Sequence, residues 1–328
     1  MSGDGVVRLF IGDHMQLAPL FAGDIAVRGV RLDIVRDGTP KTHDYTGRDT
    51  SMPAAELSLA RHLLRLAEGD RSWVGIPVFP LREFSHRFFY VRRGSRLRDL
   101  RDLQGSRIGV ADWAATGATW GRAAIAAAGV DPSSLEWLVG GLERPSSAAA
   151  VIPPHASAVK VRAIPAERSL REMLVGGDLD CVFGGMKAKP DDGIVRLVDD
   201  FVAAEARYYA ETRIYPGVHL ICVRRDVYES YPEILRDLFE TLEESRLSWQ
   251  RRLDVYHGGT PWFIADVERT RALMGSDWQP GGVEPARPMI EALLDRQLAD
   301  GLLRQRPGVS DIFREFNESE RSAAAARL

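Results

Sequence analysis

The chain has 328 residues, a length that suits about two domains of roughly 150 residues each. Hydrophobic residues make up 45% of it and charged residues 27%, as in ordinary soluble globular proteins. The formal net charge of −3 gives no reason to expect a nucleic acid or an acidic membrane as a partner.

Two features bear on the cellular compartment. Cys181 and Cys222 both lie in apolar runs, so we expect buried, reduced thiols rather than a disulfide. The first fifteen residues, MSGDGVVRLFIGDHM, lack the basic and apolar regions of a signal peptide. No run of about 18 apolar residues is present to span a membrane. We therefore expect a cytoplasmic protein without a membrane segment.

The first 80 residues alternate between strand and helix patterns. The predicted elements are strand 7–11, helix 17–22, strand 30–35, a weak strand 50–55, a helix that Ser58 caps and Gly69 ends, and an extended segment 73–78. This alternation favours an α/β fold with a mostly parallel sheet and helices on both faces.

The stretch LRDLQGSRIGVADWAATGATWGRAAIAAAGVDPSSLEWL, residues 100–138, is the most informative part of the chain. It predicts a strand at 107–110, a polar corner, and a helix that starts at Thr116-Gly117-Ala118-Thr119 and ends at Gly129. This order resembles the entry to the second lobe of type II periplasmic-binding-protein folds. There, the N–H groups of a helix N-terminus bind an anionic ligand. An ordinary strand–helix unit of another α/β protein is the alternative.

Two similar apolar strands, FFYVRR at 88–93 and HLICVRR at 219–225, each end in an arginine pair. We interpret them as the two hinge strands of a two-lobed α/β protein. Lobe one is then 1–90 plus 220–328, with C-terminal helices, and lobe two is 91–219. The alternative, two sequential domains, predicts a linker near the middle of the chain. The only segment with such a composition, 140–158, fits better as a loop inside lobe two.

Ligands of open α/β sheets bind beyond the carboxyl ends of strands, so polar residues just after predicted strands are the candidate site residues. They are Asp13, His14, Glu56, Ser58, Arg82, His86, Asp112, Thr116, Gly117, Thr119, Gly184, Tyr215 and His219. Each has a plain structural alternative: Ser58 as a helix cap, Glu56 as a first-turn carboxylate, Arg82 in a surface ion pair, His219 as a half-buried imidazole. A functional site requires that several of them meet in a cleft between the lobes.

Several blocks carry a more specific likeness. GIPVFPLREFSH, RFFYVRRGSRLRDLRDLQGSRIGV, WLVGGLERP, IYPGVHLICVRRDV, TPWF and LMGSDWQPGGVEPARP resemble segments of the 4,5-dihydroxyphthalate decarboxylase family, from Leu9 to about Phe313. That family is an enzymatic, cytosolic offshoot of substrate-binding proteins. Family positions are matched by Glu56, Arg82, Phe84, His86, Tyr215, Pro216 and His219. The chain departs from the family after the first strand, where Asp13-His14-Met15-Gln16 replaces Asp-Tyr-Asp-Arg, so a related ring acid is as good a substrate candidate as dihydroxyphthalate.

The resemblance implies a decarboxylase, a carboxy-lyase, that protonates the ring carbon bearing the carboxylate. His86 is the preferred acid and His219 the alternative, while Glu56 accepts a phenolic proton. Arg82 and the helix start at 116–119 are expected to hold carboxylates. The alternatives are a binding protein or sensor for a small organic anion without catalysis, or a menaquinone- or thiamine-pathway enzyme on the same fold.

No metal-binding or nucleotide-binding spacing is present, so we expect no cofactor. A divalent metal assembled in space from Asp13, His14, Glu56, His86 and His219 is left open. The expected partner is a small aromatic carboxylate, with no nucleic acid and no membrane. The sequence leaves open whether the protein forms a homo-oligomer.

Overall fold

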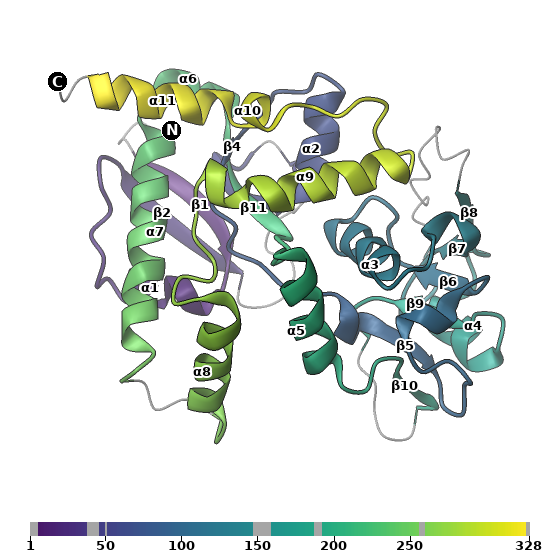
Figure 1. Cartoon of the computed structure of the whole chain (residues 1–328). Helices are drawn as coiled ribbons and strands as arrows, with labels where there is room; N and C mark the ends of the chain where they lie inside the picture. Colours follow the sequence, from purple (N-terminus) through teal and green to yellow (C-terminus); the bar gives the residue numbers. More distant parts are fainter. Residues whose placement is uncertain are drawn as a thin grey trace. The chain divides into compact units, whose positions relative to one another are not determined.

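The computed structural model describes residues 6–37, 46–49, 51–146, 159–186, 192–255 and 260–325. The chain divides into two compact units (Figure 1). Unit 1 comprises Met1–Arg82, Gly217–Ile290 and Pro307–Leu328, and unit 2 comprises Glu83–Pro216 and Glu291–Arg306. Within the described ranges, no helix is long and apolar enough to cross a membrane.

Unit 1 is built on a five-stranded sheet in the order β2-β1-β3-β11-β4. Its strands are β1 (Val6–Gly12), β2 (Arg31–Asp37), β3 (Ala54–Ser58), β4 (Trp73–Ile76) and β11 (His219–Arg224). β1 is parallel to β2 and β3, whereas β11 is antiparallel to β3 and β4. The carboxyl ends of β1 and β3 and the first residue of β11 therefore share one edge of the sheet.

The helical elements of unit 1 follow the strands or come from the C-terminal part of the chain. They are η1 (Met15–Leu17), α1 (Ala18–Phe21), α2 (Leu59–Ala67), α6 (Arg225–Ser230), α7 (Ile234–Arg252), α8 (Phe263–Met274), the first part of α9 (Val283–Ala299), α10 (Val309–Ile312) and α11 (Arg314–Ala325). α7 packs against η1 and α1, and the Leu20 N–H donates to the Ser245 hydroxyl at 3.2 Å.

β3 lies several residues later than the weak strand predicted at 50–55. Its sequence, AAELS, has low strand propensity, but all five residues are buried in the middle of the sheet, so tertiary burial decides its conformation. Ser58 ends this strand at the N-cap position of α2, yet its side chain makes no capping hydrogen bond. Instead, the Leu59 N–H donates to the Val218 carbonyl at 3.0 Å.

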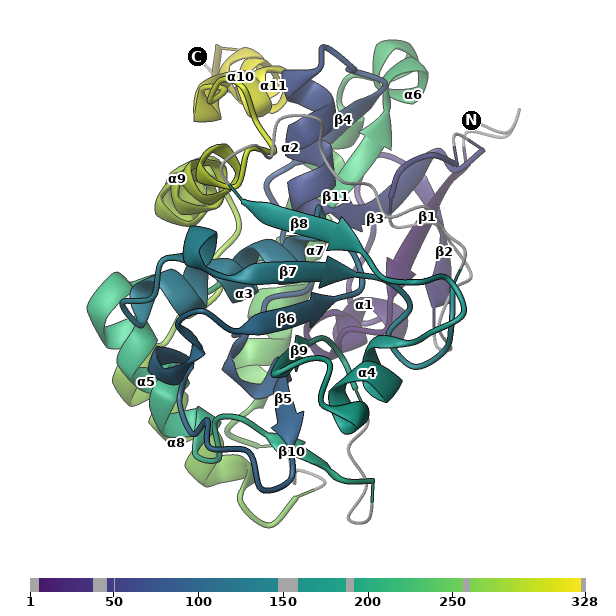
Figure 2. The ribbon, with the colours of Figure 1, turned by 90° about the vertical axis from the view of Figure 1, so that its right-hand side faces the viewer.

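Unit 2 contains a six-stranded sheet in the order β10-β5-β9-β6-β7-β8. Figure 2 shows β6, β7 and β8 side by side. The strands are β5 (Phe89–Arg92), β6 (Arg107–Val110), β7 (Glu136–Val139), β8 (Lys160–Ala163), β9 (Cys181–Phe183) and β10 (Ile194–Arg196). β5 is antiparallel to β9 and β10, and the other pairs are parallel.

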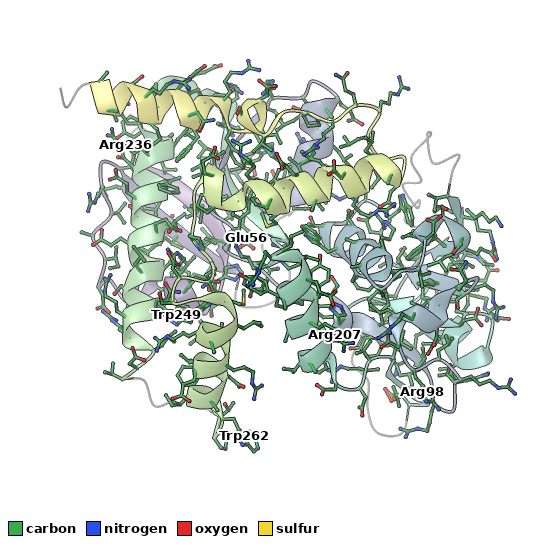
Figure 3. The ribbon with its side chains drawn as sticks, in the orientation of Figure 1. Glu56, Arg98, Arg207, Arg236, Trp249 and Trp262 are labelled. Atoms are coloured by element: carbon green, nitrogen blue, oxygen red, sulfur yellow. The ribbon has the colours of Figure 1, made fainter. Side chains whose placement is uncertain are left out.

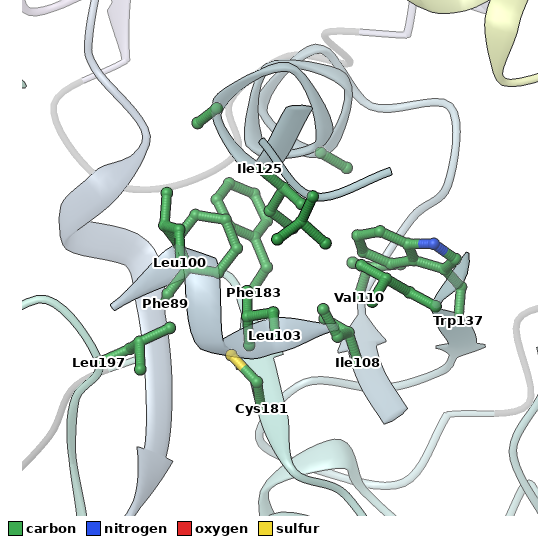
Figure 4. Close-up of a cluster of buried hydrophobic side chains, with 14 of the residues drawn as sticks. Phe89, Leu100, Leu103, Ile108, Val110, Ile125, Trp137, Cys181, Phe183 and Leu197 are labelled. Atoms are coloured by element: carbon green, nitrogen blue, oxygen red, sulfur yellow. The ribbon is translucent and has the colours of Figure 1, made fainter. Parts of the chain in front are cut away.

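The helical elements of unit 2 are η2 (His86–Phe88), η3 (Leu100–Leu103), α3 (Thr116–Ala127), η4 (Pro132–Ser134), α4 (Leu170–Gly176), α5 (Phe201–Thr212) and the end of α9. α3 begins at Thr116, as the sequence predicts. Large apolar side chains between α3 and the sheet, among them Phe89, Ile125, Trp137 and Phe183, form a core (Figure 4). Burial of each stabilises unit 2 by roughly 1.5–3 kcal/mol.

The predicted hinge strands are instead body strands of the two sheets: β5 belongs to unit 2 and β11 to unit 1. Their apolar side chains are buried, which an exposed linker would not allow. The chain crosses between the units earlier, at 82/83 and again at 216/217. The two crossing segments run antiparallel, because the Glu83 N–H donates to the Pro216 carbonyl at 3.0 Å and the Val218 N–H to the Leu81 carbonyl at 2.8 Å.

Residues 291–306 form part of unit 2, whereas the sequence placed them in lobe one. Two contacts explain the difference. Asp300 pairs with Arg122 of α3 at 2.5 Å, and both side chains are fully buried. Leu302 packs against the apolar core of unit 2. The helical pattern of this segment was readable from the sequence, but its buried charge partner was not.

Candidate functional site

Three candidate residues meet at the carboxyl edge of the unit 1 sheet. His14 follows the end of β1, Glu56 lies near the end of β3, and His219 opens β11. β11 is antiparallel to β3 with Ile221 opposite Glu56, so His219, two residues before Ile221, lies on the same face of the sheet as Glu56. We call His14, Glu56 and His219 the Glu56 cluster.

The Glu56 carboxylate lies between the two imidazoles. Its Oε2 is 2.9 Å from His14 Nε2, and its Oε1 is 2.6 Å from His219 Nδ1. Oε2 also accepts a hydrogen bond from the Gly12 N–H at 2.7 Å. Only 1% of the Glu56 side chain is exposed, against 15% for His14 and 17% for His219. The carboxylate of Glu56, which is labelled in Figure 3, is therefore buried, while both rings are partly exposed.

The two rings keep Glu56 ionised. Burial alone would raise the pKa of this carboxyl, but the hydrogen bonds from His14 and His219 and the charges of these rings hold it well below its usual range. An ionised carboxylate can only accept hydrogen bonds, so His14 donates from Nε2 and His219 donates from Nδ1. The ring nitrogens that do not contact Glu56 are Nδ1 of His14 and Nε2 of His219.

Gly12 makes this packing feasible. A Cβ atom at this position would lie 2.7 Å from His14 Nε2 and 3.2 Å from Glu56 Oε2. Any larger residue would push the His14 ring away from the carboxylate. The sequence analysis missed this role, although a glycine at the end of the first strand was the available signal.

The other candidates in unit 1 have separate contacts. Asp13 forms an ion pair with Arg36 at 2.6 Å, and about half of each side chain is exposed, so this is a surface pair. The Arg82 guanidinium donates to the Pro280 carbonyl at 3.1 Å and lies 5.0 Å from the Phe79 ring centre. Ser58 is buried two residues after Glu56.

In unit 2, four candidates lie at or before the start of α3. Asp112 accepts from the Ala114 N–H at 3.0 Å, and Ala115, not a threonine, occupies the N-cap position. A Cβ atom on Gly117 would meet no other atom within 4 Å, so the backbone is accessible there. Thr116 is buried.

Thr119 has a structural role that the sequence did not predict. Its hydroxyl donates to the Ala115 carbonyl at 3.2 Å and accepts from Arg122 at 3.1 Å. Arg122 also donates to the Trp113 carbonyl at 3.0 Å, and its guanidinium lies 3.8 Å from the centre of the Trp113 ring. Thr119 is fully buried and both hydrogen-bonding capacities of its hydroxyl are used, which argues against direct ligand binding. The signal missed was an arginine within the apolar helix segment WGRAAIAA.

Gly184 and Tyr215 also have internal contacts in unit 2. The Gly184 N–H donates to the Phe88 carbonyl at 3.0 Å, so this N–H is not available to a ligand. The Tyr215 ring packs against Phe84 with ring centres 5.0 Å apart.

His86, the preferred acid of the sequence analysis, is buried in unit 2. Its Nδ1 has no hydrogen-bond partner, and burial lowers the pKa of its imidazole to about 4. It lines a pocket with Ala124, Ala127 and Ala128, at the C-terminal end of α3. The structure therefore does not place it beside Thr116, at the other end of that helix.

Among the residues that the structure describes, no group of three or more His, Cys, Asp and Glu side chains is arranged to hold a metal ion. Within the Glu56 cluster, each carboxylate oxygen faces a ring nitrogen at hydrogen-bond distance. The donor atoms thus face one another instead of converging on a common point.

Comparison with known proteins confirms the resemblance found in the sequence. No protein-family model matches the chain. A curated 4,5-dihydroxyphthalate decarboxylase of Comamonas testosteroni is 28% identical over 316 residues, which cover 94% of this chain and 96% of that protein. One of Pseudomonas putida is 28% identical over 179 residues, covering 54% of this chain and 69% of that protein. Both names indicate a decarboxylase, which is a carboxy-lyase, as the sequence predicted.

Solved structures confirm the predicted fold class. The desulfurization enzyme DszB aligns with a TM-score of 0.50 at 15% identity, over 97% of this chain and 99% of that chain. The periplasmic aliphatic sulphonate binding protein SsuA of Escherichia coli aligns with a TM-score of 0.50 at 13% identity, over 94% and 96% of the two chains. The chain therefore has a periplasmic-binding-protein fold with two mixed α/β sheets.

Proposed function

We propose that the protein decarboxylates a hydroxylated aromatic carboxylic acid, such as 4,5-dihydroxyphthalate or a related ring acid, and that the Glu56 cluster supplies the proton. One observation carries the proposal: a buried, ionised Glu56 holds two partly exposed imidazoles at 2.6 and 2.9 Å. The curated relatives supply the reaction class.

In the proposed reaction, the His219 imidazolium donates its Nε2 proton to the ring carbon that bears the carboxylate. A ring hydroxyl ortho or para to that carbon releases its proton to solvent; an oxygen lone pair forms the carbonyl, and a pair of ring π electrons forms the new C–H bond. The bond between that carbon and the carboxylate then breaks, carbon dioxide leaves, and its electron pair restores the aromatic ring as the ring oxygen regains a proton. One proton is consumed for each carbon dioxide released, and the imidazole recovers it from solvent.

This assignment changes two roles that the sequence suggested. Glu56 is sealed and both its oxygens accept hydrogen bonds, so it does not take up a phenolic proton directly. It is a positioning residue that orients His219 and compensates the positive charge of the imidazolium. His219 replaces His86 as the acid, because a buried imidazole with a pKa of about 4 is neutral near pH 7.

Two groups are proposed to bind carboxylates. Arg82 carries a planar guanidinium that suits bidentate contact with a carboxylate. The N-terminus of α3, with accessible backbone at Gly117, suits an anion because its N–H groups are not paired within the helix.

The direct test measures carbon dioxide release from 4,5-dihydroxyphthalate and a panel of hydroxybenzoates by the purified protein. We expect release from at least one of these acids, with a much lower turnover for Glu56→Gln, whose neutral amide cannot compensate the imidazolium charge. Tight binding of panel members without carbon dioxide release would overturn the proposal and favour a binding protein or sensor.

A further inference from the structure

Unit 2 contains a pocket that the proposed reaction does not use. Its volume is about 310 Å³, at the small end of the range of about 300–1,000 Å³ found for ligand sites. Ala124 and Ala127 of α3, its C-cap residue Ala128, and Leu100, Val198 and Ala204 give the pocket an apolar part. This part can pack against one ring of a ligand.

His86 supplies one directed polar group. The residue is 6% exposed, and its ring packs edge-on against Tyr208 with ring centres 5.5 Å apart. Its Nδ1 is shielded and has no partner, so the nitrogen that faces the pocket is Nε2. Burial keeps the ring neutral. His86 therefore offers the pocket a neutral imidazole that can form a hydrogen bond with a ligand.

Two opposite charges lie one helical turn apart on α5. Arg207, labelled in Figure 3, and Glu211 both line the pocket, and neither forms an ion pair with a residue that the structure describes. The other charged residues of the pocket, Arg101 and Asp99, lie 3.6 Å from each other. Among the described residues that line the pocket, Arg207 and Glu211 thus offer a cation and a carboxylate without an ion-pair partner, and His86 offers a neutral imidazole.

We propose that this pocket is a second binding site, for a hydroxylated aromatic monocarboxylate. Arg207 pairs with the ligand carboxylate, Glu211 accepts from a ring hydroxyl, His86 forms a hydrogen bond with a ring hydroxyl, and the ring packs against the apolar part of the pocket. A phosphate or a dicarboxylate would require more cationic side chains than Arg207 alone. The ligand class is that of the product of the proposed decarboxylation, so the choice of ligand rests on the proposed function.

The test is calorimetric titration of the full chain with 3,4-dihydroxybenzoate. Ala127→Phe fills the pocket, and Ala126→Phe is its matched control, because Ala126 is exposed on the same helix and does not line the pocket. We expect binding at a site that Ala127→Phe abolishes and Ala126→Phe preserves. Arg207→Ala should lower the affinity of this site for 3,4-dihydroxybenzoate by about tenfold or more, because a charge-assisted contact is lost. His219→Asn should leave this site intact.

Equal binding by the two phenylalanine variants, or no effect of Arg207→Ala, would overturn the second site. Thermal melting of each variant shows whether it is folded, and Arg207 is exposed, so its replacement tests the site without altering the core. The two proposals fail differently. Carbon dioxide release with pocket-independent binding would refute the second site alone, whereas pocket-dependent binding without carbon dioxide release would refute the decarboxylase.

Discussion

Each unit buries a charged side chain, but the surroundings differ. In unit 1, Glu56 is 1% exposed and contacts two imidazoles that are 15% and 17% exposed. In unit 2, Arg122 is 0% exposed and pairs with Asp300, also 0% exposed, beneath the Trp113 ring. The buried Glu56 carboxylate contacts two partly exposed imidazoles. The buried Arg122 guanidinium contacts a buried carboxylate and an indole ring.

The two buried charges therefore suit different purposes, one proton transfer and the other structural stability. A buried carboxylate that orients partly exposed imidazoles can support proton transfer, because the rings exchange protons with solvent or substrate. A fully enclosed ion pair exchanges nothing and serves to fix the position of one segment against another. Burial of a charge is therefore not by itself a sign of a functional site. Contact between the buried charge and partly exposed titratable side chains is such a sign.

The largest expected effect is on turnover. His219→Asn keeps an N–H near the position of Nδ1 to donate to Glu56 but removes the titratable Nε2. We expect turnover to fall by roughly 10²–10⁴-fold, the range for loss of a general acid. Steady-state kinetics of carbon dioxide release measures it. His14→Gln, which keeps the donor at Nε2, is the matched control, and a larger loss for His14→Gln than for His219→Asn would reverse the assignment.

In unit 2, breaking the enclosed pair should affect stability. Arg122→Ala removes one of the two guanidinium groups that pair with buried Asp300 and leaves Arg296 at 2.7 Å, so we expect the free energy of unfolding to fall by about 1.5–3 kcal/mol in urea titrations. Arg162→Ala is the control, since it removes a surface ion pair with Glu136 and should cost less than about 1 kcal/mol. Similar losses for the two variants would show that Arg122 is not structurally special.

The two units can also be compared by how their stability changes at acidic pH. Burial lowers the pKa of His62 in unit 1 and of His86 in unit 2 to about 4, from 6.5. Between these values the unfolded chain binds more protons, so stability falls as the pH is lowered, by about 1.4 kcal/mol per pH unit for each histidine. Urea unfolding at pH 4.5–6.5 measures this slope. Glu56 adds little there because its contribution is lost only as the pH falls below its usual value of 4.5.

Replacement of either histidine by leucine should lower the slope of the unfolding free energy against pH by the contribution of one histidine, about 1.4 kcal/mol per pH unit. The two variants test the two units separately. An unchanged slope in His62→Leu or His86→Leu would mean that the replaced histidine is already protonated, or already exposed, in the folded protein.

The smallest effect concerns the spacing of the Glu56 cluster. Gly12→Ala places a methyl group against the His14 ring, so the hydrogen bond from His14 to Glu56 should break while His219 stays in place. We expect about a tenfold loss of turnover, as for one charge-assisted hydrogen bond, and little change in stability. Gly185→Ala, where a methyl group meets no atom within 4 Å, should be neutral. Unaltered kinetics in Gly12→Ala would show that His14 does not contribute.

The sequence predicted the fold class because that class depends on local patterns. Glu56, His14 and His219 were found by the position of polar residues at strand ends, and the sheet order brings those ends together. The distances between them, and the sealed state of Glu56, depend on register and packing, which no local pattern specifies. We therefore propose a positioning role for Glu56 in place of the base that the sequence suggested.

His86 shows where local reasoning failed. It is four residues after Arg82, and that spacing suggested a shared site. The chain passes from unit 1 to unit 2 between Arg82 and Glu83, and η2 then turns the His86 ring into the interior of unit 2. The two residues therefore belong to different units although they are close in sequence.

The partnership of Arg122 with Asp300 has a consequence for protein synthesis. The two residues are 178 positions apart, so a growing chain exposes all of α3 and the unit 2 strands long before residue 300 leaves the ribosome. Until then, a nascent unit 2 must either keep the Arg122 guanidinium in water or bury it without its carboxylate. Unit 2 thus completes its fold late in translation, and any chain that terminates before residue 300 lacks the carboxylate that pairs with Arg122.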